Sequence, residues 1–267
     1  GIVGSRNKSC LDKGVQMDSD ALKKVIEVFE DDYITLLGIC QGHYLCPKDR
    51  LGKRQGPLVA YVERDENGRN LVGEVFVHFA MAEQYPQLLH HFALKFFPKI
   101  IASLDFDVFC GATYGGLAFG LVLALVCGKK FVYPEKEIEP APNGGRKTTL
   151  IFRRHEIQPK EKVVIVEDVS NNFSTAKALI RLIGIAGGQT TGIASFLNRS
   201  LSVDNEYVAQ GGSRVPVLSL VRQPIPEYRQ DDPYVAEDIE KGNIIWDPKR
   251  DWDILLEAMQ ADQKHSY

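Results

Sequence analysis

Apolar positions in the second half of the chain fall into short runs that alternate with longer helical stretches. The short runs lie at residues 107 to 111, 129 to 133, 148 to 154, 162 to 168, 190 to 197 and 215 to 221. Residues 115 to 127 and 174 to 187 lie between some of them and have the length and composition of helices. Strands that are apolar on both faces and alternate with helices predict an α/β fold with a doubly wound parallel sheet. Ligands of such sheets bind beyond the carboxyl ends of the strands.

The remaining segments are less regular. Residues 18 to 31 have apolar side chains at helical spacing after an Asp and a Ser that suit a helix start. Residues 57 to 80 predict a strand, a turn at residues 65 to 68, and a second strand or helix start. Residues 134 to 147 are rich in Pro, Gly and charge, and they predict a mobile surface loop.

Three segments are therefore expected along the chain. Residues 1 to 100 form an N-terminal region, residues 101 to 225 form the α/β core, and residues 226 to 267 form a tail packed on that core. The tail is polar except around residues 244 to 246 and in a terminal helix that starts near Trp252.

Charge is balanced along the chain. The 32 basic and 35 acidic residues give a formal net charge of −3 and form no basic patch, so neither nucleic acid nor an anionic membrane is expected as a partner. The five cysteines are not closely paired in sequence, which favours reduced thiols over disulfides or a zinc site. No segment has the pattern of a membrane span or a signal peptide, so a cytoplasmic location is expected.

Polar residues gather where the apolar strand at residues 163 to 166 gives way to a helix. The strand delivers Glu167 and Asp168 to its carboxyl end, where two adjacent carboxylates suit hydrogen bonds from the vicinal hydroxyls of a ribose. The turn then enters a helix whose first amides lack internal partners and whose dipole favours an anion.

Side chains in that turn suit the same ligand. Asn171 and Asn172 tolerate left-handed backbone geometry, and Ser174 and Thr175 are able to cap the helix or donate to phosphate oxygens. One interpretation is a ribose 5-phosphate site. The other is a solvated acidic pair followed by an Asn-rich turn and a helix cap, and this segment alone does not decide between them.

The stretch "VVIVEDVSNNFST" resembles the ribose-phosphate motif of type I phosphoribosyltransferases. Other segments follow the order of that family's motifs. Residues 107 to 120 resemble its pyrophosphate loop, residues 129 to 142 the strand and flexible catalytic loop of orotate phosphoribosyltransferases, and residues 147 to 169 the crossover into the motif strand. Residues 40 to 49 are similar to the hood that covers the base in orotate enzymes.

This resemblance implies a role for each matching residue. Glu167 and Asp168 would hold the ribose hydroxyls of phosphoribosyl pyrophosphate, and Lys136 would act from the catalytic loop. The residues implied for the 5-phosphate are Ser170, Asn171, Asn172, Phe173, Ser174 and Thr175, those for pyrophosphate are Ala112, Thr113, Tyr114 and Gly115, and that for the base is Arg199. Magnesium would arrive bound to the substrate, and a homodimer is implied because the family's flexible loop often serves the neighbouring subunit.

Two parts of the chain depart from the family pattern. Phe173 and Ser174 stand where the phosphate loop of the family has glycines, and a Phe limits how closely the backbone approaches a phosphate. In the flexible loop, Glu135 and Glu139 replace an Arg and a Lys, and Ala141 replaces a His. The two added negative charges would repel a polyanion.

The predicted function is a phosphoribosyltransferase that joins a nitrogenous base, of the orotate-like pyrimidine type, to phosphoribosyl pyrophosphate and releases pyrophosphate. One alternative is a protein of the same fold that senses a nucleotide or phosphoribosyl pyrophosphate without turning it over, which the altered flexible loop would suit. A second is an NAD-dependent Rossmann enzyme, because "GATYGG" follows a strand and opens a helix. Against it, Thr113 stands where the dinucleotide motif needs its second glycine, and Glu167 and Asp168 have no role in it.

Overall fold

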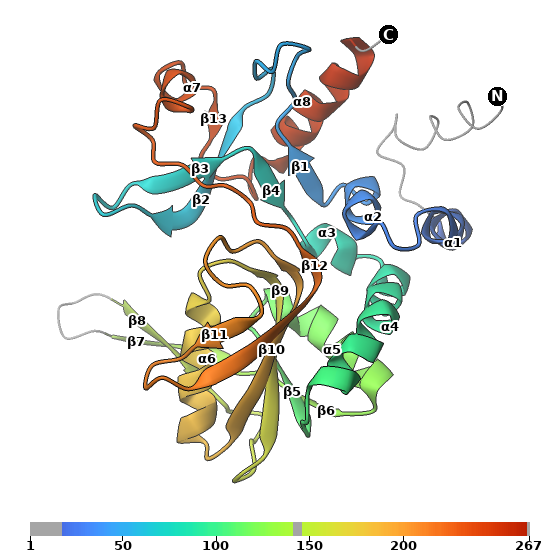
Figure 1. The fold of residues 1–267 in the computed structure, drawn as a ribbon, viewed down its shortest axis with the longest axis vertical. Coiled ribbons are helices and arrows are strands. Elements are labelled where there is room, and N and C mark those ends of the chain that lie inside the picture. Colours follow the sequence, from blue (N-terminus) through green and yellow to red (C-terminus); the bar gives the residue numbers. More distant parts are fainter. Residues whose placement is uncertain (1–17, 141–145, 266–267) are drawn as a thin grey trace. The chain divides into compact units, whose positions relative to one another are not determined.

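The computed structural model of the chain describes residues 18 to 140 and 146 to 265. Its residues divide into two compact units (Figure 1). Unit 1 comprises Gly1–Ala82 and Pro226–Tyr267, and unit 2 comprises Glu83–Ile225. The C-terminal segment therefore shares a unit with the N-terminal residues.

Unit 2 is built on a six-stranded sheet in the order β11, β12, β10, β9, β5, β6. The strands are β5 (Val108–Gly111), β6 (Lys130–Val132), β9 (Lys162–Ser170), β10 (Gln189–Asn198), β11 (Glu206–Val208) and β12 (Arg214–Arg222). Neighbouring strands are parallel except β11 and β12. Helices α4 (Pro86–Ser103) and α5 (Gly115–Cys127) cover one face and α6 (Ser174–Ile185) covers the other (Figure 1). The predicted doubly wound α/β sheet is confirmed.

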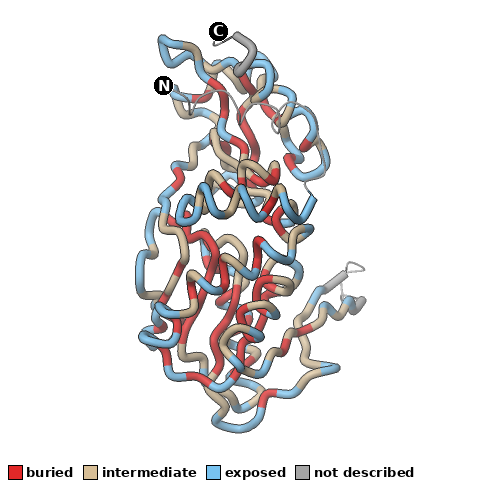
Figure 2. Tube along the Cα trace, turned by 90° about the vertical axis from the view of Figure 1, so that its right-hand side faces the viewer, coloured by how far each residue is buried: buried red, intermediate tan, exposed pale blue. Residues whose placement is uncertain are grey.

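The central strands are buried on both faces, as Figure 2 shows by the red stretches along the trace. On the face covered by α6, Ile165, Ile193 and Val217 are Cα partners in successive strands and belong to one apolar cluster with residues of α6. On the other face, Phe196 packs on Phe92 of α4 with 4.7 Å between ring centroids. These two apolar layers fix the strands in register, so their carboxyl ends lie at a common edge.

Unit 1 contains a two-stranded antiparallel sheet, a three-stranded mixed sheet and several helices. Its elements are α1 (Ser19–Val28), α2 (Tyr33–Ile39), β1 (His43–Leu45), β2 (Leu58–Arg64), β3 (Asn70–Gly73), β4 (Val75–Val77), α7 (Ala236–Glu240), β13 (Ile244–Ile245) and α8 (Trp252–His265), and α3 (Ala80–Glu83) lies at the unit boundary. The predicted helix over residues 18 to 31 is confirmed, because the Asp18 carboxylate accepts hydrogen bonds from the backbone N–H groups of Asp20 and Ala21. No helix in the described ranges has the length and hydropathy needed to cross a membrane.

The prediction of a surface loop over residues 134 to 147 is wrong for most of that segment. Glu135–Pro140 forms β7, which pairs in antiparallel register with β8 (Arg146–Ile151), while residues 141 to 145 lie outside the described part. Ion pairs join the two arms of this hairpin: Arg154 Nε lies 2.9 Å from Glu135 Oε1, and Arg153 contacts Glu137. Opposite charges across the arms stabilise a pairing that the Pro and Gly content obscures.

The C-terminal segment is held in unit 1 by strand pairing, apolar packing and a charge network. Strand β13 pairs in parallel with β2, and Trp252 and Leu255 of α8 pack in a cluster with Tyr44 and Val59.

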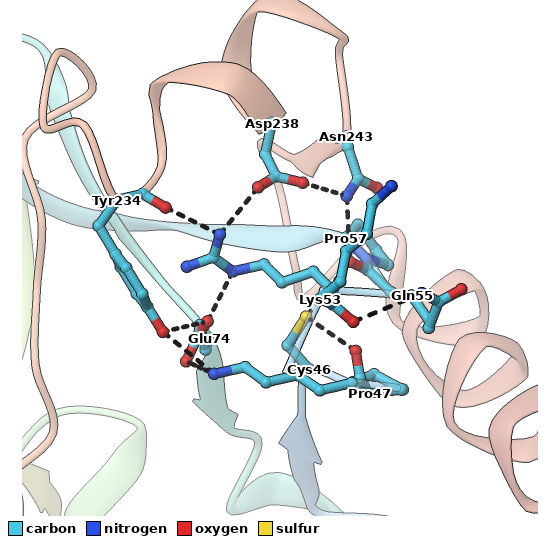
Figure 3. A network of polar contacts seen from close by, with 12 residues as sticks. Cys46, Pro47, Lys53, Gln55, Pro57, Glu74, Tyr234, Asp238 and Asn243 are labelled. Carbon is cyan, nitrogen blue, oxygen red and sulfur yellow. Dashed lines mark hydrogen bonds and ion pairs between the residues drawn. The ribbon is translucent and has the colours of Figure 1, made fainter. Parts of the chain in front are cut away.

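Figure 3 shows this network, in which Glu74, Tyr234 and Asp238 are labelled. It centres on Arg54, whose side chain is 9% exposed. Its Nε donates to Glu74 at 2.6 Å, and its Nη1 donates to Asp238 at 2.9 Å and to the carbonyl of Tyr234 at 2.8 Å. Although burial acts in the opposite direction, hydrogen bonds from Lys48 and Arg54 lower the pKa of Glu74.

We expect Arg54→Met to lower the free energy of unfolding by about 3 to 5 kcal/mol, because it leaves two carboxylates without their buried partner. Denaturant unfolding followed by circular dichroism measures this loss. Arg250→Met is the matched control, since Arg250 is an exposed arginine whose side chain pairs with Asp251. The control should change stability by less than about 1 kcal/mol. Equal effects of the two substitutions would contradict a structural role for the network.

Candidate active site

Two loops meet at the carboxyl ends of neighbouring strands β5 and β9. Gly111 is the Cα partner of Val166, and the backbone N–H of Ala112 donates to the Val166 carbonyl at 2.8 Å. The Ala112 carbonyl in turn accepts from the N–H of Gly116 at 3.1 Å. Both backbone groups of Ala112 are thus engaged inside the fold, and the loop that follows turns beside Asp168.

Glycines let this loop approach β9 closely. A Cβ at Gly115 would lie 2.6 Å from Cγ of Asp168, and a Cβ at Gly116 would overlap the carbonyl oxygen of Val166. A real side chain at either position would force the loop or the strand to move. The structure therefore packs the Asp168 carboxylate directly against the loop whose sequence resembles a pyrophosphate loop.

The two acids do not share one side of the sheet. Side chains alternate along a strand, so Asp168 lies on the α5 side against Gly115, whereas Glu167 lies on the α6 side with Ile165. Glu167 is half-buried, and burial together with the neighbouring Asp168 carboxylate raises its pKa to about 8. A carboxyl group with that pKa holds its proton at neutral pH until a ligand stabilises the charge.

In the turn after β9, the side chain that accepts a backbone N–H of the helix and the residue with left-handed backbone geometry both differ from those predicted. Helix α6 begins at Ser174, so Ser174 and Thr175 lie inside its first turn and do not cap it, contrary to the expectation. The Asn172 carboxamide oxygen instead accepts the Ser174 N–H at 2.9 Å. The left-handed residue is Phe173, with φ 58° and ψ 21°, and not Asn171 or Asn172.

Phe173 is compatible with the loop because its ring lies in the core. The residue is 4% exposed, belongs to the apolar cluster beneath α6, and stacks on Tyr207 of β11 with ring centroids 5.4 Å apart and planes 16° apart. The backbone thus adopts a conformation that glycine usually supplies, and burial of the ring offsets the conformational cost. Ser170, which precedes the turn, is also buried, and its hydroxyl has no hydrogen-bond partner among the described residues.

Tyr114 carries backbone strain in the other loop. Its φ of 71° and ψ of −67° correspond to a rare and strained three-residue turn, and its side chain is exposed. The Lys136 ammonium of β7 lies 4.6 Å from the centroid of the Tyr114 ring. The structure therefore brings the hairpin lysine to the loop at residues 113 to 115.

The negative charges of the hairpin are partly neutralised. Glu135 pairs with Arg154 and Glu137 pairs with Arg153, so the Glu135 charge expected to repel a polyanion has a cationic partner. The side chain of Glu139 and all of Ala141 lie outside the described residues.

Backbone hydrogen bonds hold Arg199 beside the turn at residues 170 to 175. Its backbone N–H donates to the Ser170 carbonyl at 2.9 Å, and its carbonyl accepts from the Ile225 N–H at 3.1 Å. The residue is buried at the end of β10. The structure therefore places the residue predicted to bind the base next to the residues predicted to bind the 5-phosphate.

The acids of the site do not form a resident metal centre. Within the described ranges, no group of three or more His, Cys, Asp or Glu side chains is arranged to hold a metal ion. A cation at this edge would need oxygen ligands from a bound substrate in addition to Asp168 or Glu167.

Comparison with known proteins supports the resemblance. The chain is similar to the orotate phosphoribosyltransferase of Campylobacter lari, with 33% identity over 103 residues, which are 38% of this chain and 47% of that protein. It is also similar to the orotate phosphoribosyltransferase of Caldanaerobacter subterraneus subsp. tengcongensis, with 24% identity over 79% of this chain and 89% of that protein. The chain spans about half the length of the first of these curated relatives. No family model matches the chain.

Among solved structures, the chain is similar to the UMP synthase of Leishmania donovani, with a TM-score of 0.50 and 14% identity over 77% of this chain and 41% of that one. This likeness concerns the fold. The chain has the type I phosphoribosyltransferase fold. The resemblance that the sequence indicated is thereby confirmed, and the phosphoribosyltransferase motifs of the sequence fall on the carboxyl edge of the sheet.

Sequence reasoning missed several residues at this phosphoribosyltransferase-like edge. Arg153 and Arg154 were not assigned, although an antiparallel pairing of residues 135 to 140 with the apolar run at 148 to 154 would have brought them near Glu135 and Glu137. Ser195, the Cα partner of Glu167, carries no sequence signal of its own. Only strand register reveals it.

Proposed function

We propose that the chain is a phosphoribosyltransferase that transfers ribose 5-phosphate between phosphoribosyl pyrophosphate and a nitrogenous base, with an orotate-like pyrimidine as the base. The observation that carries this proposal is the packing of the Asp168 carboxylate against Gly115, which joins an acid for ribose hydroxyls to a loop for pyrophosphate. The names of the curated relatives support the same reaction and the same base.

In this proposal each part of the site has one task. The first-turn amides of α6, with Ser170 and the side chains at residues 171 to 175, bind the 5-phosphate. Asp168 and Glu167 accept hydrogen bonds from the ribose hydroxyls. Thr113, Tyr114 and Gly115 contact pyrophosphate, while Arg199 orients the base.

Lys136 contributes charge where the leaving group departs. It is a catalytic residue in this proposal because its ammonium group, held over the Tyr114 ring, lies beside the loop that would bind pyrophosphate. Positive charge placed there before the reaction stabilises the developing negative charge of the leaving group. Magnesium bound with the pyrophosphate would supply further charge neutralisation, and Asp168 would be able to offer it a carboxylate oxygen.

Isothermal titration calorimetry of the full chain with phosphoribosyl pyrophosphate and Mg²⁺ tests the binding part of this proposal. We expect saturable binding that weakens when Mg²⁺ is removed. An absence of heat at millimolar ligand, confirmed by a second method such as equilibrium dialysis, would contradict the proposal.

Close packing at Gly115 yields a prediction for the same assay. Gly115→Ala should weaken the binding of phosphoribosyl pyrophosphate by about tenfold or more, because the new methyl group displaces Asp168 or the loop. Gly184→Ala is the matched control: a Cβ at that α6 position would meet no atom within 4 Å. The control should leave affinity unchanged and add roughly 0.5 to 1 kcal/mol of stability. Equal affinities of the two variants would contradict the role given to Gly115.

The proposal includes a homodimer. Helix α5 contains no charged residue, yet Leu121 and Leu125, one turn apart on it, are 56% and 76% exposed. Such an apolar helix face favours burial against a protein surface. Light scattering should give twice the mass of the chain, and a monomer at all concentrations up to about 100 μM would contradict the dimer.

A cytoplasmic location stays a prediction.

A further inference from the structure

The loop after β10 is shaped by hydrogen bonds from side chains. Residues 199 to 205 connect β10 to β11, and Arg199, the residue proposed to orient the base, is the first of them. Most residues from 201 to 205 are exposed, whereas Val203 packs on the apolar cluster beneath α6. An exposed loop is mobile unless specific contacts order it.

Asn198, the last residue of β10, joins both ends of this loop through its carboxamide. The residue is 0% exposed. Its Oδ1 accepts the backbone N–H of Ser200 at 3.0 Å, and its Nδ2 donates to the carbonyl oxygens of Val203 and Asp204, each at 3.0 Å. Both donor hydrogens and the oxygen of one buried carboxamide are therefore used within the same loop.

Arg222 holds the loop from the neighbouring strand. It is the last residue of β12 and the Cα partner of Asn198. Its Nε donates to Asp204 Oδ1 at 2.7 Å, its Nη1 to the Asn198 carbonyl at 3.1 Å, and its Nη2 to the Ser200 carbonyl at 2.8 Å. One guanidinium group thus contacts the residues on either side of Arg199 and the far end of the loop. We call Asn198 and Arg222 together the loop clasp.

The loop clasp fixes the peptide groups on both sides of Arg199. The N–H and the carbonyl of Arg199 form hydrogen bonds with the end of β9 and with the segment after β12. The Asn198 carbonyl accepts from Arg222, and the Ser200 N–H donates to Asn198. Every N–H and carbonyl of these two peptide groups is engaged, and a polar network that is fully satisfied makes a backbone rigid.

We propose that Asn198 and Arg222 are positioning residues for base binding: they close the loop at residues 199 to 204 and so hold the backbone of Arg199 where this residue binds the base. That Arg199 binds the base rests on the proposed function, whereas the loop clasp is a property of the unliganded chain. A displacement of about 1 Å in a site of this kind costs on the order of 100-fold in rate. The loop clasp therefore governs how well the site accepts a base.

Two ligands that share the ribose 5-phosphate test this role by calorimetric titration of the full chain. Orotidine 5′-monophosphate carries a base, and phosphoribosyl pyrophosphate carries none. Asn198→Asp keeps the size of the side chain and the acceptor for Ser200, but it sets an oxygen against the carbonyls of Val203 and Asp204. We expect it to bind orotidine 5′-monophosphate about tenfold or more weakly and phosphoribosyl pyrophosphate within about twofold of the unaltered chain.

Arg222→Gln should show the same difference between the two ligands. Because Arg222 is partly exposed, this variant keeps the test decisive if Asn198→Asp fails to fold. Arg214→Gln is the matched control, since Arg214 lies at the other end of β12 and pairs with Glu206 at 2.6 Å. The control should change neither affinity. Equal losses for both ligands in the clasp variants, or an unchanged affinity for orotidine 5′-monophosphate, would overturn the positioning role.

Amide hydrogen exchange of the unliganded chain, followed by NMR, tests the loop clasp alone. The N–H groups of Ser202 and Val203 donate to Ser200 Oγ at 3.3 and 3.2 Å. They should exchange about tenfold faster in both clasp variants and at an unchanged rate in Arg214→Gln. Unchanged exchange in the clasp variants would overturn the clasp. If the unaltered chain does not bind orotidine 5′-monophosphate, the proposed function fails and the positioning role fails with it, while hydrogen exchange still decides whether the loop is clasped.

Discussion

Asp168→Asn is expected to weaken the binding of phosphoribosyl pyrophosphate roughly 100-fold. Hydrogen bonds from ribose hydroxyls to a carboxylate are charge-assisted, and the loss of two of them corresponds to a change of that size. Asparagine keeps the shape of the side chain that packs on Gly115, so the loop at residues 113 to 115 should stay in place. Calorimetric titration with the ligand and Mg²⁺ measures the change.

The matched control for this variant is Asp105→Asn. Asp105 precedes β5 at the opposite, amino edge of the sheet, is exposed, and pairs with Lys162. It removes the same charge from the same unit without touching the site, so affinity should stay within about twofold. Equal affinities of Asp168→Asn and the unaltered chain would contradict the role of Asp168. If Asp168→Asn and Asp105→Asn lost the same affinity, the loss would reflect the change in net charge and not a contact made by Asp168.

Phe173→Ala should lower the free energy of unfolding by about 3 to 5 kcal/mol, because it empties the core beneath α6 of a large ring. Phe173→Gly should be less harmful by about 1 kcal/mol, since glycine adopts the left-handed backbone of this position without strain. At most buried positions the Gly variant is less stable than the Ala variant. Denaturant unfolding of the two variants measures the difference.

Phe119 provides the comparison for this reversal. It is a fully buried Phe in the interior of helix α5, where Gly should be worse than Ala by about 1 kcal/mol. If Phe173→Gly were also less stable than Phe173→Ala, the left-handed conformation of Phe173 would be contradicted. If Gly is more stable than Ala at Phe173 but less stable than Ala at Phe119, the turn has a backbone conformation that favours glycine although Phe occupies the position.

Much of the sheet could be predicted because its strands carry their own pattern. Val163 to Val166 is apolar at every position, and such a run forms a buried parallel strand in any doubly wound sheet. Helix α5 was predicted at its observed bounds because it is uniformly apolar between Gly115 and Gly128. The hairpin β7–β8 was missed because the Pro, Gly and charge content of residues 134 to 147 is typical of a loop, while the ion pairs of Glu135 and Glu137 with Arg154 and Arg153 form only once the two arms are paired.

The candidate site was predicted in its residues more than in its geometry. Glu167 and Asp168 were found together, but strand alternation places them on opposite faces, and only one of them packs on the neighbouring loop. Phe173 looked like an obstacle to phosphate, since composition alone does not show that Tyr207 and the α6 cluster receive its ring. Tertiary contacts of this kind decide which side of a loop a large side chain occupies.

The proposed site combines the acid pair at the end of β9, a loop that its glycines let pack against Asp168, and Lys136 beside that loop. Whether this arrangement transfers the phosphoribosyl group or only senses its donor depends on the altered hairpin. A sensor would bind phosphoribosyl pyrophosphate and hold it intact, whereas an enzyme would release pyrophosphate when the correct base is present.

The most direct measurement is therefore the release of pyrophosphate from phosphoribosyl pyrophosphate by the full chain with Mg²⁺, over a panel of bases that includes orotate, uracil and purines. We predict release that depends on the base, is greatest with orotate, and is lost in Asp168→Asn. Tight binding of phosphoribosyl pyrophosphate with no release for any base would contradict transfer and leave a sensor of the donor.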